Sequence, residues 1–324
     1  MSFGLRTTGA EAALKLQDHI RGKNVLITGV TQGGLGGETA RVLSPYVNLL
    51  ILVGRNPDKL QETLQVIKGE TPSVNVQTVS IDLSSLQSIR RGALEIAHPI
   101  HVLINNAAIV PTTELTRTKD GFESQFGTNH LGHFYLTSLL LPRILSAVSA
   151  SYSPRVVNVS SAAIHDPRVG SNIRLDDPNY ILRPEEYQRM ISYSVSKVAN
   201  TLHAREIAKR YKSDGILAFS LHPGGVWTNL VNNSPVDLRQ ELGLIDENGK
   251  VLQPERFKSI AEGTSTHIVA AFDPLIKEYS GAYLCDCRVT AWNDLPACLN
   301  EDNALKLWML SEELTSKGSI EIDA

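Results

Sequence analysis

Short apolar runs alternate with longer amphipathic segments along most of the chain. The apolar runs are rich in Val, Ile and Leu at consecutive positions, which is typical of strands buried on both faces of a parallel sheet. They predict strands at residues 24–28, 49–53, 74–81, 102–105, 155–160 and 216–221, with a seventh at 282–285. The amphipathic segments predict helices at residues 36–43, 57–68, 85–97, 120–146, 186–212, 255–272 and 303–315.

This alternation predicts an α/β protein: one doubly wound Rossmann domain over residues 1–324, with an about seven-stranded parallel sheet and helices on both faces. No internal repeat or long linker divides the chain. Two stretches, 162–188 and 229–254, are longer than ordinary connections between elements. Because both follow strands of the predicted sheet, we expect them to be substrate loops at its carboxyl edge.

Composition excludes several classes of protein. A chain of 324 residues with a formal charge of −3 has length for a sizeable core and no basic stripe for nucleic acid. No apolar run reaches the length of a membrane span, and residues 1–10 lack a secretory pattern. The three cysteines, Cys285, Cys287 and Cys298, lack a fourth ligand at a suitable spacing, so reduced thiols and no metal are expected. The predicted location is cytoplasmic.

A glycine-rich turn at residues 28–36 follows the first predicted strand and opens a helix. The N–H groups and positive dipole end of that helix can face a pyrophosphate. Glycines also make ordinary tight turns, but this strand–turn–helix context favours a dinucleotide site. The predicted cofactor contacts are Gly29, Gly34, Leu35 and Gly36.

The ends of the next strands indicate which dinucleotide binds. The second strand ends without the carboxylate that holds the ribose of NAD, and Arg55 offers a planar donor fork for a 2′-phosphate. We therefore predict NADP (NADPH) and favour this role for Arg55 over that of a surface arginine near a helix start. Asp82 and Leu83 are expected beside the adenine, and Asn106 and Ala107 where the backbone approaches the cofactor. Each of these pairs could also be an ordinary turn.

Tyr193 and Lys197 stand four residues apart and therefore share one face of the predicted helix. An ammonium near a phenol lowers the pKa of the phenol from about 10. A phenol tuned in this way passes a proton near neutral pH. A proton donor of this kind that faces a hydride carrier predicts an alcohol or carbonyl oxidoreductase.

The order of the motifs resembles the short-chain dehydrogenase/reductase family over nearly the whole chain. The resemblance rests on the glycine turn, Asp82-Leu83, Asn105-Asn106-Ala107, Asn129, Ser160-Ser161, Tyr193-x-x-x-Lys197 and His222-Pro223-Gly224. Residues 36–40, 129–134 and 280–284 look like the retinol-dehydrogenase-like branch, including its fungal members.

The resemblance implies a role for each of four residues. Tyr193 is the implied general acid/base on the substrate oxygen. Lys197 is implied to lower the pKa of Tyr193 and to hold the nicotinamide ribose. Ser161 is implied to donate a hydrogen bond to the developing alkoxide, and Asn129 to anchor a water that links Lys197 to solvent. Without the resemblance, Ser161 reads as a turn residue and Asn129 as a polar residue in a helix.

The resemblance also implies that the segment after the sixth strand covers the nicotinamide. Its contacts are expected from Pro223, Gly224, the backbone of Val226 and the hydroxyl of Thr228, with His222 structural. A homodimer or homotetramer through the long helices after strands four and five is usual among similar proteins.

Three departures from the family pattern stand out. The glycine loop is one residue longer, which leaves the register of Gly33 and Gly34 open. Ala108 replaces a final glycine. The 31 residues between Ser161 and Tyr193 exceed the usual separation, and we interpret this insert as a lid or pocket wall.

The leading prediction is an NADP(H)-dependent oxidoreductase that acts on a carbonyl or secondary alcohol of a small, fairly apolar substrate. The apolar character is suggested by loop residues Ile173, Leu175, Tyr180, Leu230, Val231 and Leu238. An NAD-retaining epimerase or dehydratase is an alternative, but its usual glycine spacing, acidic ribose clamp and longer C-terminal domain are missing. A non-catalytic NADP-binding regulatory protein is another alternative. The intact set of Tyr193, Lys197, Ser161 and Asn129 argues against it, because drift would be expected to erase at least one of these residues in a protein without activity.

Overall fold

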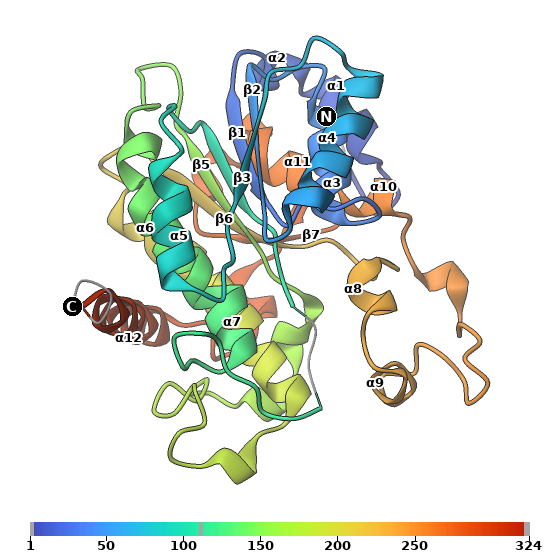
Figure 1. The fold of residues 1–324 in the computed structure, drawn as a ribbon, viewed down its shortest axis with the longest axis vertical. Helices are drawn as coiled ribbons and strands as arrows, with labels where there is room; N and C mark the ends of the chain where they lie inside the picture. The colour runs from blue at the N-terminus through green and yellow to red at the C-terminus, as the bar shows by residue number, and fades with distance from the viewer. Residues whose placement is uncertain (1–2, 110–112, 321–324) are drawn as a thin grey trace.

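An eight-stranded sheet in the order β3-β2-β1-β4-β5-β6-β7-β8 forms the centre of the protein (Figure 1). The computed structural model describes residues 3–109 and 113–320. The strands are β1 (Asn24–Thr28), β2 (Leu49–Gly54), β3 (Val76–Ser80), β4 (Val102–Asn105), β5 (Arg155–Val159), β6 (Leu217–His222), β7 (Tyr283–Cys285) and β8 (Arg288–Val289).

Strands β1 to β7 pair in parallel, whereas β8 runs antiparallel to β7. The predicted doubly wound α/β fold is therefore confirmed. The antiparallel β8 was not predicted, because it has only two residues and follows β7 through a tight turn. The order in which successive strands are added reverses between β1 and β4, and ligands bind at the carboxyl edge of such a switch point.

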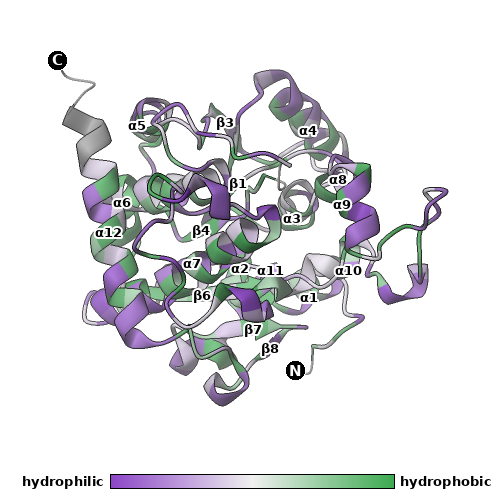
Figure 2. Ribbon diagram, turned by 90° about the horizontal axis from the view of Figure 1, so that it is seen from below, coloured by the Kyte–Doolittle hydropathy of each residue, from purple (hydrophilic) through white to green (hydrophobic). Residues whose placement is uncertain are grey.

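Helices cover both faces of the sheet (Figure 1). One apolar core joins the sheet to α5 (Leu86–Leu94), α6 (Gly132–Leu145), α7 (Arg189–Arg210) and α12 (Glu301–Ile320). The other joins it to α1 (Gly9–Lys15), α2 (Gln17–Ile20), α3 (Leu35–Leu43), α4 (Pro57–Glu70) and α11 (Ser265–Phe272). Helices such as α4 and α12 show both hydrophobic and hydrophilic residues (Figure 2), as expected for helices with one buried side.

Two predicted helices are interrupted in the structure. The helix predicted at 120–146 is a π-helix at Phe126–Leu131 followed by α6. The helix predicted at 255–272 consists of a 3₁₀ turn at Pro254–Arg256, then α10 (Ile260–Gly263) and α11. α10 starts afresh because Ser259 and Glu262 form a capping box.

The two long connections lie at the same end of the sheet, below it in Figure 1. The connection at 162–188 contains 3₁₀ turns at Ala162–His165, Pro167–Val169 and Pro184–Glu186. The connection at 229–254 contains α8 (Asn229–Asn232) and α9 (Val236–Glu241). Further 3₁₀ turns occur at Pro274–Tyr279 and Trp292–Asp294.

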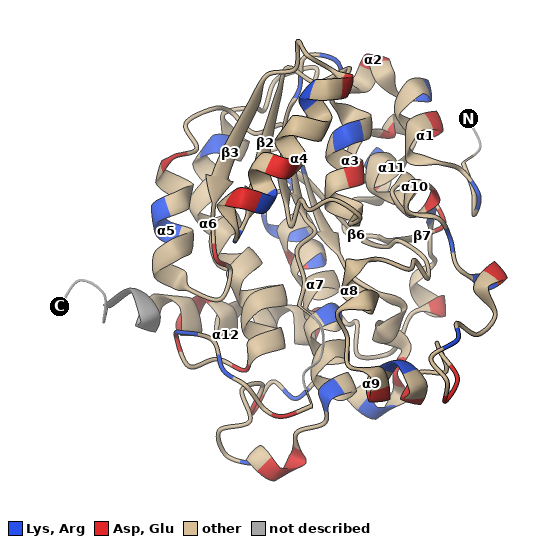
Figure 3. Ribbon diagram, turned by 45° about the vertical axis from the view of Figure 1, so that its right-hand side comes forward, with Lys and Arg blue, Asp and Glu red and all other residues tan. Residues whose placement is uncertain are grey.

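Charged residues gather on the helices and outer loops, with both signs mixed, whereas the strands carry few of them (Figure 3). Among the described helices, none combines the length and the apolarity needed to cross a membrane.

Acid is expected to destabilise the fold through its buried histidines. Burial lowers the pKa of His133, His222 and His267 to about 4 and that of His203 to about 3. Since an unfolded histidine titrates near 6.5, the unfolded state binds more protons at lower pH, and stability falls between pH 6.5 and about 4. Tm measured across this range should drop steeply. His203→Gln should flatten the drop and the exposed control His98→Gln should not; a flat wild-type profile would refute the explanation.

Candidate active site

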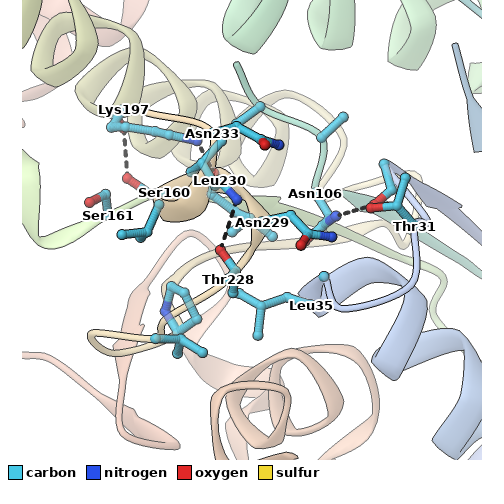
Figure 4. A pocket seen from close by; sticks show the side chains of 18 of the residues that line it. Thr31, Leu35, Asn106, Ser160, Ser161, Lys197, Thr228, Asn229, Leu230 and Asn233 are labelled. Carbon is cyan, nitrogen blue, oxygen red and sulfur yellow. Dashed lines mark hydrogen bonds between the residues drawn. The ribbon is translucent and has the colours of Figure 1, made fainter. Parts of the chain in front are cut away.

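A cavity of about 650 Å³ lies at the carboxyl edge of the sheet. Its wall comes from the glycine turn after β1, the ends of β4 and β5, helix α7 and the segment after β6. Figure 4 shows Ser161 and Lys197 at one end, Thr31 and Asn106 at the other, and Thr228 to Leu230 between them. Distant parts of the chain therefore share one elongated site.

The glycine turn is built by close packing. Gly29 has a φ of 73°, and a Cβ on it would lie 2.7 Å from the Cα of Ala107. A Cβ on Gly36 would lie 2.5 Å from Nδ2 of Asn106, which donates to the carbonyls of Thr28 at 2.8 Å and Gly29 at 3.3 Å. Only glycine fits at these two positions.

Three of the four predicted glycine-turn contacts line the cavity: Gly29, Gly34 and Leu35. Gly36 lies beneath them, against Asn106. Gly34 is the N-cap of α3, so the first N–H groups of that helix face the cavity at this point. Gly33 takes the left-handed conformation, with a φ of 70°, and this fixes the register of the longer loop.

Arg55 lines the cavity and also a neighbouring one of about 160 Å³, which Asp82, Leu83 and Ala107 border. Its side chain is exposed at the edge of both. Asp82 accepts hydrogen bonds from the Ser84 hydroxyl at 2.7 Å and from Lys119 at 3.1 Å. Burial alone would raise the pKa of Asp82, but these donors outweigh it and hold the pKa below its usual value.

Tyr193, Lys197 and Ser161 meet at the opposite end of the cavity. The Lys197 ammonium is buried, lies 5.6 Å from the centre of the Tyr193 ring, and donates to the Val159 carbonyl at 3.2 Å. Burial lowers the pKa of Lys197 to about 8. The side chains predicted to carry the chemistry are thus in one place.

The pKa of Tyr193 moves in the direction opposite to the sequence-based expectation. Burial raises it, and a hydrogen bond with the Ser161 hydroxyl only partly opposes this. In this state the Lys197 ammonium donates to the Val159 carbonyl at 3.2 Å. The phenol is therefore protonated at neutral pH in this state of the protein.

The two neighbouring serines have different surroundings. Ser160 is buried, donates to the Lys197 carbonyl at 2.7 Å and accepts from Thr201 at 3.0 Å. Ser161 is half-buried at the cavity wall, and its hydroxyl accepts the Ala163 N–H at 3.2 Å. This geometry leaves Ser161 free to donate into the cavity and supports the preference for it.

Asn129 lies in the π-helix and joins two parts of the site. Its Oδ1 accepts from the Ile109 N–H at 2.9 Å, and its Nδ2 donates to Ser196 Oγ at 3.2 Å. Ser196 in turn donates to the Tyr193 carbonyl at 2.7 Å. Through Ser196, the side chain of Asn129 therefore holds the backbone at Tyr193. The backbone carbonyl of Asn129 is hydrogen-bonded to the His133 ring at 2.9 Å.

The segment after β6 forms one wall, and Pro223, Gly224, Val226 and Thr228 all line the cavity. Sequence reasoning missed Asn229, whose Nδ2 donates to the Gln32 carbonyl at 2.6 Å and so spans from this segment to the glycine turn. No sequence signal marks that contact, because the two residues lie 197 positions apart.

The apolar residues of the two long connections do not form one shared surface of the cavity. Leu230 and Val231 line the cavity, whereas Ile173, Tyr180 and Leu238 are buried within the protein. None of the described residues 162–188 lines the cavity. The insert is instead fixed to the domain, for example through hydrogen bonds from Arg117 to the carbonyls of its residues 179 and 180.

Comparison with known proteins gives consistent matches. A family model described as short chain dehydrogenase matches residues 23–173. Human retinol dehydrogenase 12 is 36% identical over 297 residues, which is 90% of this chain and 86% of that protein. The chloroplastic short-chain dehydrogenase TIC 32 A of Brassica napus is 34% identical over 295 residues, 89% of this chain and 87% of that one. A crystal structure of an uncharacterised Mycobacterium paratuberculosis protein matches with a TM-score of 0.68 and 30% identity, over 92% of this chain and 94% of that one.

These matches place the chain among the oxidoreductases that bind a nicotinamide cofactor on a Rossmann-type sheet. It belongs to the short-chain dehydrogenase/reductase family, as a retinol-dehydrogenase-like member.

Proposed function

We propose that the protein is an NADP(H)-dependent oxidoreductase that acts on a carbonyl or secondary alcohol, with Tyr193 as the general acid/base. The observation that carries this proposal is the shared cavity, with the Tyr193, Ser161 and Lys197 side chains at one end and a helix N-terminus at the other. Helix-terminal N–H groups suit a pyrophosphate, and the hydroxyl pair suits a substrate oxygen.

The residues of the cavity fit a nicotinamide dinucleotide. Gly34 and Leu35 would hold the pyrophosphate, Arg55 the 2′-phosphate, and Asp82 and Leu83 the adenine side. When bound, the nicotinamide exchanges a hydride with the substrate carbon. Thr228 and the backbone of Val226 would hold its ring, and Lys197 its ribose.

Tyr193 moves the proton. Its raised pKa keeps the phenol protonated at neutral pH, so it is prepared to donate to the oxygen of a carbonyl as that oxygen gains charge. Ser161 is hydrogen-bonded to Tyr193 and lines the same wall, where a second donor stabilises the developing alkoxide. The nearby Lys197 ammonium stabilises the phenolate left behind. This arrangement favours carbonyl reduction.

The substrate side of the cavity supports a fairly apolar ligand, because Leu230 and Val231 form part of its wall. Retinol dehydrogenase 12, a relative at 36% identity, is named for an alcohol. We also propose that the protein is cytoplasmic and that it assembles as a homodimer or homotetramer. An epimerase is disfavoured because Arg55 stands where an acidic ribose clamp belongs, and a regulatory protein because the Tyr193 and Ser161 hydroxyls remain hydrogen-bonded at the wall.

Thermal stability with each nucleotide tests the proposal. NADPH at about 100 times its Kd should stabilise the protein by about 2.7 kcal/mol, visible as a rise in Tm, with a smaller rise from NADH. Consumption of NADPH with a panel of apolar ketones and aldehydes should follow. A protein that gains no stability from either nucleotide would refute the proposed function.

Arg55 is expected to set the preference between the two nucleotides. Arg55→Asp should move the ratio of kcat/KM for NADPH over NADH towards NADH by about 10²-fold, because a charge-assisted hydrogen bond is exchanged for repulsion. Lys277→Asp, at an exposed cation remote from the cavity, is the matched control and should leave the ratio unchanged. An unaltered ratio in Arg55→Asp would contradict the assignment.

A further inference from the structure

An ion pair between the buried Lys258 side chain and the partly exposed Asp286 side chain lies behind the wall of the cavity that the segment after β6 forms. The Lys258 side chain is 3% exposed and that of Asp286 is 36% exposed. Within the described ranges, Asp286 is the one carboxylate in ion-pair contact with this ammonium. Such a partner offsets the cost of burying an ammonium, so the pair holds Lys258 in a defined position.

Lys258 is attached to the segment after β6 at several points. Its N–H donates to the Gly225 carbonyl at 2.8 Å, and it forms a parallel β-bridge with Val226. Its stem runs against Gly224, where a Cβ would meet the Lys258 Cδ at 2.6 Å and Cε at 2.8 Å. Gly224 and Val226 line the cavity, whereas Lys258 is behind them.

Asp286 is held in place by an unusual turn. β7 and β8 pair with Cys285 opposite Arg288, so Asp286 and Cys287 are the two central residues of the hairpin. Both have positive φ, 49° and 64°, which matches a turn type that normally takes Asn and Gly. Strained backbone of this kind persists where surrounding contacts determine it and is frequent beside functional sites. Here the contacts are the Lys258 ammonium at Asp286 and, at Cys287, the Thr266 hydroxyl, which accepts the Cys287 N–H at 3.2 Å, and the Ser265 hydroxyl, which accepts from the thiol at 3.1 Å.

We infer that Lys258 and Asp286 are positioning residues for cofactor binding, which together hold the wall at residues 222–226 in its binding geometry; this inference rests on the proposed function. His222 begins that wall and pairs in register with Cys285, next to Asp286. The ion pair thus links the hairpin at the sheet edge to the surface that would meet the nicotinamide. Removal of either charge should loosen that surface before it affects the proton-transfer groups.

Asp286→Asn is the sharper variant, because it leaves a buried ammonium unpaired. The ammonium must then reach water and withdraw its stem from Gly224, so KM and Kd for NADPH should rise about tenfold while kcat at saturation changes less than about threefold. Lys258→Met keeps the apolar stem and should raise KM by about threefold. The double variant should return to the level of Lys258→Met, because no unpaired buried charge remains.

Controls separate positioning from general stability. Lys306→Met and Asp302→Asn remove an exposed ion pair on α12 and should leave KM and Kd unchanged. All measurements are made well below each variant's Tm. If Tm falls while Kd and KM stay at wild-type values, the pair is merely structural and the inference is overturned. If Asp286→Asn does not fold, Lys258→Met and the double variant decide.

Hydrogen exchange of the protein without nucleotide gives a readout that does not depend on the proposed function. The Lys258 amide, bonded to Gly225, and the amides of residues 224–228 should exchange at least about tenfold faster in Lys258→Met than in Lys306→Met. Unchanged exchange overturns the inference. A wild-type protein that binds neither nucleotide refutes the proposed function, and faster exchange would still support the clamping of this segment.

Discussion

Tyr193→Phe is expected to lower kcat for carbonyl reduction by about 10³-fold, because general acid catalysis contributes 10²- to 10⁴-fold. The phenol lies at the cavity wall, is hydrogen-bonded to Ser161 and keeps its proton at neutral pH. Phenylalanine preserves the ring and removes only the proton donor. The Kd for NADPH should therefore stay within about threefold of the wild-type value.

The control for this variant is Tyr279→Phe, which removes a hydroxyl from an exposed tyrosine remote from the cavity and should have wild-type kcat. Steady-state kinetics with the best carbonyl of the panel and a fluorescence titration of NADPH give the two readouts. Equal reduction rates in Tyr193→Phe and wild type would end the proposed mechanism. Ser161→Ala should cost about 10²-fold in kcat, and the double variant should cost far less than the product, because the two hydroxyls act as a unit.

Lys197 is expected to give reduction its pH dependence. The pKa of its ammonium is lowered by burial to about 8, so the cation is present below pH 8 and lost above it. In the proposed mechanism, the phenolate that would form at Tyr193 during reduction needs that cation. We therefore expect kcat for reduction to be constant up to about pH 7 and to fall progressively above pH 8.

Two substitutions test whether Lys197 is the group that causes the fall in kcat above pH 8. Lys197→Met removes the cation at every pH, so kcat should be at least about 10²-fold lower and should show no limb near pH 8. Lys197→Arg keeps a charge throughout this range and should move the limb above pH 10, although the larger group will lower the maximum. A limb that stays near pH 8 in Lys197→Met would show that another group titrates there.

The sequence predicted the sheet and the gathering of the site, because both follow from short-range patterns. Apolar runs located seven parallel strands to within about two residues, since buried parallel strands have few polar positions. Tyr193 and Lys197 share a helix face, and strand ends share a sheet edge, so Ser161 and the glycine turn could be brought to them from topology alone.

The features that the sequence did not predict depend on packing between residues far apart in the chain. The direction of the Tyr193 pKa shift depends on burial and on where the Lys197 ammonium is directed, which the four-residue spacing does not specify. The insert at 162–188 was expected to be a lid or pocket wall, yet none of its described residues lines the cavity. Likewise, Lys258 and Asp286 are separated by 28 positions and meet through a turn without glycine.

The cavity is assembled from chain segments that emerge from the ribosome at very different times. The glycine turn follows β1, the first strand, whereas the opposite wall follows β6. At usual rates of synthesis these parts appear roughly 10 to 40 s apart, and the central strand β1 must wait for β4 before both of its edges are paired. A nascent chain would thus expose a half-built nucleotide groove, and translation arrested before β6 would yield a species unable to retain its coenzyme.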